Sequence, residues 1–503
     1  MNIKRQKKDF LDVLIYRIVY FCVPMRDDEL RQILRARNPW WTLAASGRDP
    51  LGWVARDPVL EGARQVGIAY DPPVLADVAP PGLYVIRGPR RVGKSVSCKR
   101  LVARQCAGPH TSPWQVIYLS ADGLRTQDLR RTFTLGRELT APAGLGPRLW
   151  VIDEITTIDG WVPLVKELRD NTELAFDAVV LTGSSAQDLA EARRSLGAGR
   201  TRVADPFRIV LPMTFRQYLE VTGAPLPATD PVGPDQLMAD ISRRAVVALE
   251  PLVETLDLAW QQFLESGGFP RAVGESLHRG GVSDEFVFDL VSWLAADVEE
   301  GRADSVVRLL LELRDRMGAP LNVRHLAQSL GTTRFHLEAR LRRLIETFGA
   351  FWCPQLGRDD LPKPGSQAKL YLIDPLLARL PYLRDGSLED ADMTQLTESQ
   401  LALELVRAID RIAHDRFVEQ RAVLYARAPG SGETDFAPVS IPAAGSPALT
   451  IPIECKWVSH KWKHAAMGIR RRYGHGILAT KNVVDLSGDV WAVPAPILAL
   501  LLA

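Results

Sequence analysis

The chain has 503 residues, 46% of them hydrophobic and 24% charged, which is the composition of a soluble globular protein. Its length predicts more than one hydrophobic core and therefore two to four domains. The net charge of +2 excludes a global basic field, so any contact with nucleic acid must come from local patches. The five cysteines form no CxxC pair and no His/Cys cluster at zinc-ligand spacing, which favours a reducing compartment and argues against a structural zinc site.

The N-terminal segment MNIKRQKKDFLDVLIYRIVYFCVPM has a basic start followed by an apolar stretch. Asp12 and Arg17 interrupt this stretch, and aliphatic residues recur at helical spacing. We therefore predict an amphipathic helix here, with a signal peptide as the alternative. The sequence contains no run of about 18 uncharged apolar residues, so we expect no membrane span and a cytoplasmic protein.

The segment GLYVIRGPRRVGKSVSCKRLVARQ contains a complete phosphate-binding loop. Residues 83–86 predict a short strand, residues 88–95 match G-x-x-x-x-G-K-[ST], and a helical pattern follows. The two glycines permit backbone conformations that turn N–H groups onto phosphate oxygens. The lysine would bridge the β- and γ-phosphates, and the serine would bind Mg²⁺ at the helix N-terminus. The predicted ATP-binding residues are Gly88, Pro89, Arg90, Arg91, Val92, Gly93, Lys94, Ser95 and Val96.

An acidic pair follows in the segment GPRLWVIDEITTIDGW. Residues 149–152 predict a buried strand, which ends in Asp153 and Glu154. At the carboxyl end of a parallel strand this pair faces the phosphate crevice. Asp153 would hold the Mg²⁺ shell, and Glu154 would orient and deprotonate the attacking water. The alternative is an acidic turn without chemistry.

Polar and basic residues follow the next predicted strand. The strand DAVVLTGSS ends in polar residues 182–185, of which Ser184 is a candidate for sensing the γ-phosphate. The segment EARRSLGAGRTRVADPF then carries Arg193, Arg194, Arg200 and Arg202. Hydrolysis benefits from a guanidinium on the transferring phosphate, supplied within the chain or by a neighbour, and Arg200 is our candidate for this role. The alternatives are that these arginines solvate a helix end or contact DNA phosphates.

The motifs NPWW, IRGPRRVGKS, VIDEI, VVLTGSS, GR…VLPMTFRQYL and FLESGGFPRAV occur in this order. In this combination the chain resembles a family of bacterial and archaeal AAA-type ATPases whose C-terminal half belongs to domain-of-unknown-function family 4143. The alternation of strands and helices predicts an α/β class with a parallel sheet. The resemblance adds a helical lid, a winged helix and a nuclease-like C-terminal domain. The expected domains are an N-terminal helical arm (1–75), the P-loop ATPase core (76–223), the lid (224–305), the winged helix (306–385) and the restriction-endonuclease-like α/β domain (386–503).

The segment APLNVRHLAQSLGTTRFHLEARLRRLIETFGAFWCPQ predicts a helix-turn-helix. A helix over residues 323–330 ends at Gly331, and an amphipathic helix covers residues 334–348, with a β-wing in FGAFWCPQ…AKLYLID. A DNA-binding helix needs exposed cations. The alternative is that this element packs against other domains or mediates assembly. The cations and histidine that the second helix would display are Arg334, His336, Arg340, Arg342 and Arg343.

The C-terminal segment predicts a helix, three strands, a helix and a strand, which is the element order of a restriction-endonuclease-like core. The charged residues of the second and third strands resemble the pattern (D/E)-xn-(D/E)-x-K, with Asp435, Glu454 and Lys456 in its three positions. Glu404, on the first helix, is a candidate further contributor. Two carboxylates on adjacent strands can bind Mg²⁺, which polarises a scissile phosphate and activates a water.

Lys456 follows Glu454 by two residues, so both side chains lie on the same face of the strand. The lysine can therefore stabilise the negative charge of the transition state. The following segment, KWVSHKWKHAAMGIRRRYGHG, interleaves cations with Trp457 and Trp462. Such a rim suits a phosphate backbone, and a solvated helix face is the alternative.

The sequence thus predicts an ATP- and Mg²⁺-dependent protein that acts on DNA, in which the nucleotide state controls a winged helix and a nuclease-like domain. Genome defence, mobile-element biology and repair all fit. Two alternatives stay open. The protein could be a signalling or assembly ATPase with an inactive nuclease-like scaffold, or a nucleotide-gated transcription regulator. A homo-oligomer and a protein partner at the winged helix are candidate assemblies.

Overall fold

The computed structural model describes residues 24–109, 111–185, 189–197, 199–224, 229–358, 361–414, 416–428, 432–443 and 446–503. The predicted N-terminal amphipathic helix lies outside these residues. The chain forms two compact units, of which the first comprises residues up to 62, 71–87 and 94–210. The second comprises residues 63–70, 88–93 and 211–503. The boundaries of the five domains expected from the sequence remain predictions.

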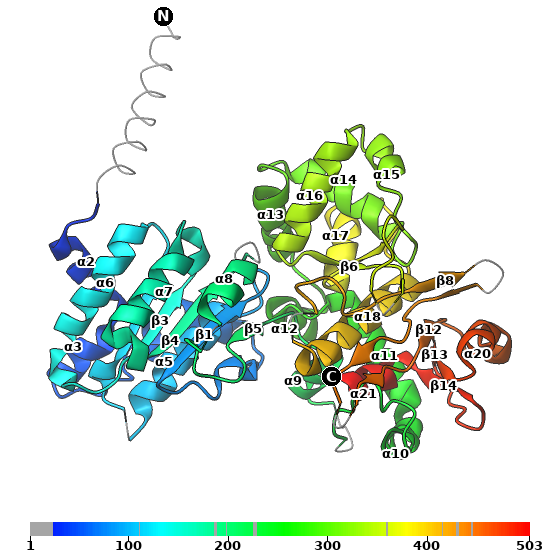
Figure 1. The fold of residues 1–503 in the computed structure, drawn as a ribbon, viewed down its shortest axis with the longest axis horizontal. Helices are drawn as coiled ribbons and strands as arrows, with labels where there is room; N and C mark the ends of the chain where they lie inside the picture. Colours follow the sequence, from blue (N-terminus) through cyan, green and yellow to red (C-terminus); the bar gives the residue numbers. More distant parts are fainter. Residues whose placement is uncertain are drawn as a thin grey trace, which may run out of the picture. The chain divides into compact units, whose positions relative to one another are not determined.

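The first unit is built on a five-stranded sheet with parallel neighbours in the order β2-β3-β4-β1-β5, as predicted for an α/β core. Helices cover both faces of the sheet (Figure 1). The strands are β1 (Gly82–Arg87), β2 (Val116–Ser120), β3 (Leu149–Asp153), β4 (Ala178–Gly183) and β5 (Phe207–Ile209). The helices of this region are α2 (Asp27–Arg37), α3 (Pro39–Ala45), α4 (Pro58–Gln65), α5 (Lys94–Ala107), α6 (Thr126–Leu139), α7 (Trp161–Asn171) and α8 (Leu189–Leu196).

The three central strands, β1, β3 and β4, are buried along their whole length. This is expected of a parallel sheet with helices on both faces, and it explains why these segments read as continuous apolar runs. Strand β4 lies between β1 and β3. Because the strands are parallel, β1, β3 and β4 all end at the same edge of the sheet, where polar residues follow them.

The NPWW motif attaches the chain to the edge strand β2. The Asn38 side-chain amide donates to the carbonyl of Tyr118 (2.9 Å) and accepts from its N–H (2.7 Å), as a neighbouring strand would. The indole N–H groups of Trp40 and Trp41 both donate to the carbonyl of Val116 (3.0 Å). The motif therefore satisfies the backbone groups of a buried sheet edge.

The second unit contains helices and several small sheets. Its helices are α9 (Phe215–Thr222), α10 (Asp240–Leu249), α11 (Val253–Ser266), α12 (Pro270–Arg279), α13 (Asp284–Val298), α14 (Ala303–Arg314), α15 (Val323–Ser329), α16 (Arg334–Glu346), α17 (Pro375–Arg384), α18 (Met393–Ile412), α19 (Trp462–Ala465), α20 (Met467–Tyr473) and α21 (Ala495–Leu502). Its strands are β6 (Ala350–Cys353), β7 (Lys369–Leu372), β8 (Ala426–Ala428), β9 (Gly432–Thr434), β10 (Ser440–Ile441), β11 (Ala448–Leu449), β12 (Ile453–Cys455), β13 (Gly476–Thr480) and β14 (Val490–Pro494). The described helices include none with the length and apolar character that a membrane crossing requires.

A double-glycine turn in FLESGGFP joins three segments of the second unit. The N–H of Gly268 donates to Asp374 (2.8 Å), and its carbonyl accepts from the N–H of Met213 (2.7 Å). Gly267 has a φ of +68°, and a Cβ there would lie 2.0 Å from the Asp374 carboxylate. A side chain at either glycine would therefore separate the segments that meet at this turn.

The helix α15, the helix α16 and the antiparallel hairpin β6–β7 follow one another in the order predicted for the winged-helix region. The Thr333 side chain caps α16 by accepting from the N–H of His336 (3.3 Å). The apolar face of α16 buries Leu337, Leu341 and Leu344, in agreement with its predicted amphipathic pattern.

Three parallel strands form the C-terminal sheet in the order β12-β13-β14. An antiparallel bridge from Phe436 to Ile453 places the chain after β9 beside β12. The last helix, α21, is buried along its whole length and packs on α9, α11 and α18. This arrangement brings the segments that carry Asp435 and Glu454 side by side.

Candidate functional site

The phosphate loop connects β1 to α5, as predicted. Gly88, Arg91 and Gly93 have φ values of 155°, 68° and 95°. Several positive φ values within one short loop are typical of loops whose N–H groups converge on an anion. Lys94, the first residue of α5, is only 5% exposed, and Ser95 is half-buried. Of the other predicted loop residues, Pro89 and Val92 are buried, Val96 is half-buried and Arg90 is exposed.

The predicted acidic pair lies at the end of β3. Asp153 is buried, and both of its carboxylate oxygens accept hydrogen bonds from hydroxyl groups, one from Tyr118 (3.0 Å) and one from Thr182. The N–H of Glu154 donates to the Thr182 hydroxyl (3.1 Å), and its carboxylate accepts from Ser184 (3.2 Å). Neutral donors therefore position both carboxylates and leave their charges uncompensated by these contacts.

The Cys98 thiol, one turn into α5, shows that these charged groups lie close together. Its pKa is raised well above the ordinary value, first by burial and then by the negative charge of Asp153. The charge of Lys94 lowers this pKa, and the charge of Glu154 raises it. The loop lysine and both carboxylates thus all influence one buried thiol, and the strands β1 and β3, which lead into the loop and the acidic pair, end at the same edge of the sheet.

Tyr118 was not predicted as a member of this site. It lies in the apolar strand VIYLS, where an aromatic residue is ordinary core. The sequence contains no signal that its hydroxyl reaches Asp153, because that contact depends on the pairing of β2 with β3.

Arg200 does not lie at the phosphate loop, contrary to the prediction. Its guanidinium forms an ion pair (2.7 Å) with Asp170, which is the second-last residue of α7. The carbonyl of the next residue, Thr201, accepts from the N–H of Leu83 (2.9 Å) near the start of β1. At about 3.3 Å per strand residue, the loop at Gly88 begins roughly 16 Å further along the chain. Arg200 thus lies at the opposite edge of the sheet from the phosphate loop. The prediction that it contacts the nucleotide bound by its own chain is therefore wrong.

The second candidate site contains the three predicted C-terminal residues. Asp435 directly follows β9, Glu454 is the middle residue of β12, and Lys456 follows that strand. The ammonium of Lys456 lies 2.9 Å from Glu454 Oε1, as expected for neighbours on one strand face. The N–H of Cys455 donates to Asp435 Oδ2 (2.9 Å), which holds the two segments together.

A second lysine, Lys369 of β7, enters the same cluster. Its Nζ lies 2.8 Å from Asp435 Oδ1, 2.9 Å from Glu433 Oε1 and 3.0 Å from Glu398 Oε1. The Lys369 side chain is fully buried, and the Tyr371 hydroxyl donates to the same Glu398 oxygen (2.5 Å). We name these residues, together with Glu454 and Lys456, the carboxylate cluster.

The helical residue of the carboxylate cluster is Glu398, and the expectation for Glu404 is wrong. Glu404 is buried elsewhere on α18, where it accepts from the N–H of Phe215 (3.2 Å) and from Gln400 (2.9 Å). Six residues correspond to one and two-thirds helical turns, so the two glutamates point to different sides of α18. The sequence pattern alone does not determine which side of this long helix packs against β7.

Burial and mutual repulsion change the protonation of the carboxylate cluster. The pKa of Glu398 and the pKa of Glu454 are each raised to about 7, first by burial and then by the negative charge of Asp435. Burial by itself would lower the pKa of Lys369, but the surrounding carboxylates outweigh it and raise that pKa above its ordinary value. The lysine is therefore cationic at neutral pH, whereas Glu398 and Glu454 can take up protons near neutral pH.

The fit of the carboxylate cluster to a metal ion is partial. In the described ranges, no three His, Cys, Asp or Glu side chains form a group that could hold a metal ion. Three carboxylates instead meet at Lys369 Nζ. Glu454 Oε2, however, is buried without a hydrogen-bond partner. An orphaned carboxylate oxygen of this kind fits a hard cation such as Mg²⁺.

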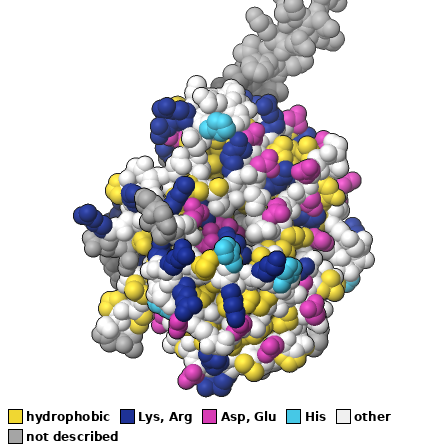
Figure 2. Space-filling model, turned by 90° about the vertical axis from the view of Figure 1, so that its right-hand side faces the viewer, with side chains coloured by type: hydrophobic (Ala, Val, Ile, Leu, Met, Phe, Trp, Pro, Cys, Tyr) yellow, Lys and Arg dark blue, Asp and Glu magenta, His cyan; other side chains and the backbone are white. Residues whose placement is uncertain are grey.

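The predicted cationic rim is present in part. Figure 2 shows acidic side chains near the middle of one face of the molecule, with Lys, Arg and His side chains around them. Arg472 is not free for a ligand, because it donates to the carbonyls of Ala426 (2.8 Å) and Gly432 (3.0 Å). The exposed cations near the carboxylate cluster in sequence are Lys456, Lys461, Lys463, Arg470 and Arg471.

Helix α16 exposes four of the five predicted polar residues, namely Arg334, His336, Arg342 and Arg343. The expectation is wrong for Arg340, which forms an ion pair with Glu299 and donates to the Ser305 hydroxyl (3.3 Å). Glu299 is only 1% exposed. Arg340 therefore compensates a buried charge, and its role is structural.

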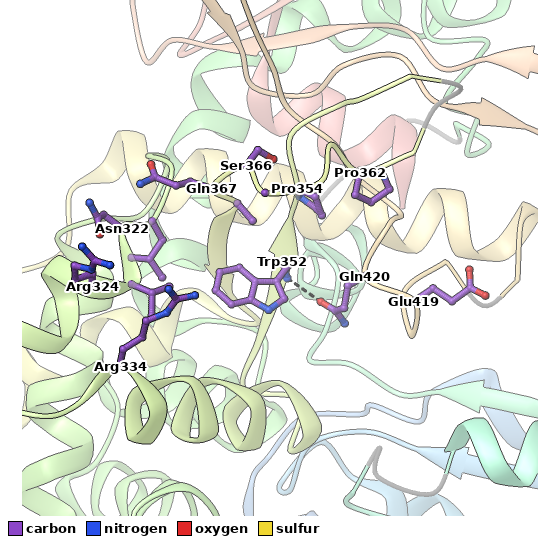
Figure 3. A pocket seen from close by; sticks show the side chains of 14 residues that line it. Asn322, Arg324, Arg334, Trp352, Pro354, Pro362, Ser366, Gln367, Glu419 and Gln420 are labelled. Atoms are coloured by element: carbon purple, nitrogen blue, oxygen red, sulfur yellow. Dashed lines mark hydrogen bonds between the residues drawn. The ribbon is translucent and has the colours of Figure 1, made fainter.

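A cavity of about 670 Å³ opens between the hairpin β6–β7 and the starts of α15 and α16. Figure 3 shows the Trp352 ring in its wall, between Arg334 on one side and Gln420 on the other. The Gln420 side chain accepts from the backbone N–H of Trp352 (2.7 Å). Arg324 also lines the cavity. A half-buried aromatic ring near two arginines is a chemically suitable surface for a nucleotide.

Residues 81–219 match a family model described as an AAA domain. With the loop, the acidic pair and the parallel sheet, this match defines an AAA-type P-loop ATPase domain in the first part of the chain. No curated protein matches the chain significantly.

Similar solved structures include a Walker-type ATPase of Pyrococcus abyssi, with 14% identity, coverage of 64% of this chain and 94% of that chain, and a TM-score of 0.38. They also include the ORC2 protein of Aeropyrum pernix in ADPNP–ADP complexes, with 12% identity, coverage of 65% and 93%, and a TM-score of 0.32. The ORC1 protein of the same organism in complex with DNA has 13% identity, coverage of 76% and 98%, and a TM-score of 0.28.

Proposed function

We propose that this protein hydrolyses ATP with Mg²⁺ and acts on DNA, and that its nucleotide state controls a metal-dependent nuclease-like site in the second unit. The observation that carries the ATPase part is the arrangement of Asp153 and Glu154, which neutral hydroxyl groups position at the carboxyl edge of the sheet, where the phosphate loop also begins.

Each residue of the ATPase site has a distinct role in this proposal. The loop N–H groups and Lys94 bind the phosphates, while Ser95 and Asp153 supply oxygen ligands for Mg²⁺. Glu154 accepts the proton of the attacking water, and Ser184 keeps the Glu154 carboxylate oriented. The bound metal ion would neutralise the charge that develops on the phosphates.

The ATPase proposal is tested by steady-state ATP turnover of Lys94→Ala. Removing a preorganised cation from the phosphates should lower turnover about 100-fold or more. Lys166→Ala, which removes an exposed lysine of α7, is the matched control and should keep wild-type turnover. Equal turnover of Lys94→Ala and the control would contradict the assigned site.

The nuclease part of the proposal is supported by the contacts among Asp435, Glu454 and Lys456. Asp435 and Glu454 would hold Mg²⁺, which activates a water and polarises the scissile phosphate. Lys456 would stabilise the developing negative charge. The exposed Arg334 and Arg342 of α16 and the Trp352 cavity would contact the DNA.

Plasmid cleavage in the presence of Mg²⁺ and ATP tests the coupling of the two sites. We expect Lys456→Ala to abolish cleavage without changing ATP turnover, and Lys94→Ala to abolish both. Lys363→Ala, which removes an exposed lysine before β7, is the control for general charge effects. Cleavage by Lys456→Ala at the wild-type rate would contradict the nuclease assignment.

The contacts of Lys369 favour a second candidate function, in which the nuclease-like region is an inactive scaffold of an assembly or signalling ATPase. An ammonium already compensates three carboxylates there. In that case the wild-type protein would not cleave plasmid under any metal condition, and DNA would not stimulate its ATP turnover. Sequence-selective DNA binding without cleavage would instead indicate a nucleotide-gated transcription regulator.

A further inference from the structure

We propose that Lys369 is a built-in cation of the carboxylate cluster and that it occupies the position of one divalent metal ion. This inference deepens the proposed nuclease function and names the ionic composition of the same site. It predicts that the cluster holds one metal ion fewer than its carboxylates could otherwise bind.

The contacts of Lys369 resemble those of a metal ion in their number and arrangement. An ammonium group has three N–H donors. The three carboxylate oxygens around Nζ, from Glu398, Glu433 and Asp435, lie at 2.8–3.0 Å. The oxygens of Glu398 and Asp435 accept hydrogen bonds from the ammonium, and the oxygen of Glu433 forms an ion pair with it. The side chain has no exposed surface, so the compensation does not depend on solvent.

The origin of these ligands makes the contact a specific feature of the fold. Lys369 comes from the hairpin β6–β7, Glu398 from α18, and Glu433 from β9. A single cation thus joins three elements that are distant in the sequence. Such convergence on a buried point charge is usual for metal sites and uncommon for a lysine, which is costly to bury without partners.

The charge balance indicates what remains for a true metal ion. The cluster contains four carboxylates and two lysine ammonium groups, so with every carboxylate ionised two negative charges remain. One divalent cation would compensate them. Glu454 Oε2, buried and without a hydrogen-bond partner, is the natural ligand for that ion. Lys369 and a single metal ion would therefore complete the site together.

The test is the number of Mn²⁺ ions bound by the nucleotide-free full-length chain, measured by electron paramagnetic resonance and by titration calorimetry. We expect Lys369→Met to bind one Mn²⁺ more than the wild type. Lys363→Met, an exposed lysine in the loop before β7, removes the same charge outside the cluster and should bind the wild-type number. Equal numbers for Lys369→Met and the wild type would overturn the inference.

Loss of Lys369 leaves several buried carboxylates uncompensated, so a second variant protects the test from misfolding. Lys369→Gln keeps an N–H donor for these carboxylates, which methionine lacks, and therefore lowers the risk of misfolding. This variant should also bind one extra Mn²⁺, because it leaves the same three carboxylates without their cation. Mn²⁺ should raise its melting temperature more than that of the wild type. The absence of both effects would overturn the inference.

The same measurement separates this inference from the proposed nuclease function. One ion in the wild type and two in Lys369→Met would support both. No ion at the cluster in the wild type and one in the variant would support the role of Lys369 and contradict metal-dependent cleavage by the native protein. Wild-type plasmid cleavage with unchanged metal binding in Lys369→Met would support the nuclease and overturn the role of Lys369.

Discussion

Asp153 ends strand β3 in the first unit, and Asp435 directly follows strand β9 in the second. In both residues, both carboxylate oxygens have hydrogen-bond donors. The donors to Asp153 are the neutral hydroxyls of Tyr118 and Thr182, whereas one donor to Asp435 is the ammonium of Lys369.

This difference teaches how one side-chain type can serve two purposes. Hydroxyl groups fix the orientation of a carboxylate and leave its full charge to attract a cation. An ammonium fixes the orientation and also compensates the charge, which weakens the attraction for a further cation. In the proposed function, the first site would therefore attract a metal ion that arrives with the nucleotide, whereas the second already contains part of its positive charge.

The largest expected effect concerns the uncompensated carboxylates of the first site. Glu154→Gln should lower ATP turnover about 100-fold, because an amide does not accept the proton of the attacking water. ATP affinity, measured by equilibrium binding, should change little. Asp159→Asn changes an exposed acid in the loop after β3 and is the control. If the turnover of Glu154→Gln were close to that of the control, Glu154 would not be the general base.

A smaller effect is expected from the pH dependence of the second site. The folded-state pKa of Glu454 is about 7, above the ordinary value of 4.5, so its contribution to stability is fully present below about pH 4.5 and is lost as the pH rises through 7. In EDTA, Glu454→Gln should therefore gain melting temperature relative to the wild type between pH 5 and pH 8, by roughly a few degrees.

The control for this pH series is Glu389→Gln, an exposed glutamate of the same unit. Its melting temperature should stay parallel to that of the wild type across the same pH range. If the melting temperature of Glu454→Gln also stayed parallel to that of the wild type, Glu454 would be ionised throughout this pH range. The electrostatic difference between the two sites would then be contradicted.

The smallest effect is expected at Arg200. Because its guanidinium contacts Asp170 at the far edge of the sheet, Arg200→Ala should leave the turnover per chain within about 2-fold, since it removes only a partly exposed ion pair. Turnover measured over a range of protein concentrations is the appropriate readout. A large loss that depends on concentration would indicate that Arg200 acts on the nucleotide of a neighbouring copy.

A site could be predicted from the sequence where its residues lie in one contiguous motif, and could not where they come from distant segments. The phosphate loop and the acidic strand end are contiguous segments, so their residue types and spacing were sufficient to identify them. Tyr118 and Lys369 escaped prediction because a tyrosine or lysine in an apolar strand has no distinctive neighbours in the sequence. The sequence suggested Glu404, whereas Glu398 is the helical carboxylate of the cluster, because the position of a residue in a helix does not define which side faces a site. The position of Arg200 could not be predicted, because a glycine-containing connection in the sequence does not specify an edge of the sheet.

By itself, the sequence determined the parallel α/β core, the phosphate loop, the Asp153–Glu154 pair and the neighbourhood of Glu454 and Lys456 on one strand. These features depend on backbone periodicity and on contiguous motifs, which local physics fixes. Only the tertiary structure decided which side chains hydrogen-bond to the carboxylates. Hydroxyls reach Asp153 from the neighbouring strands β2 and β4, and an ammonium reaches Asp435 from β7. These strands are distant in the sequence, and the packing of distant segments has no local signature.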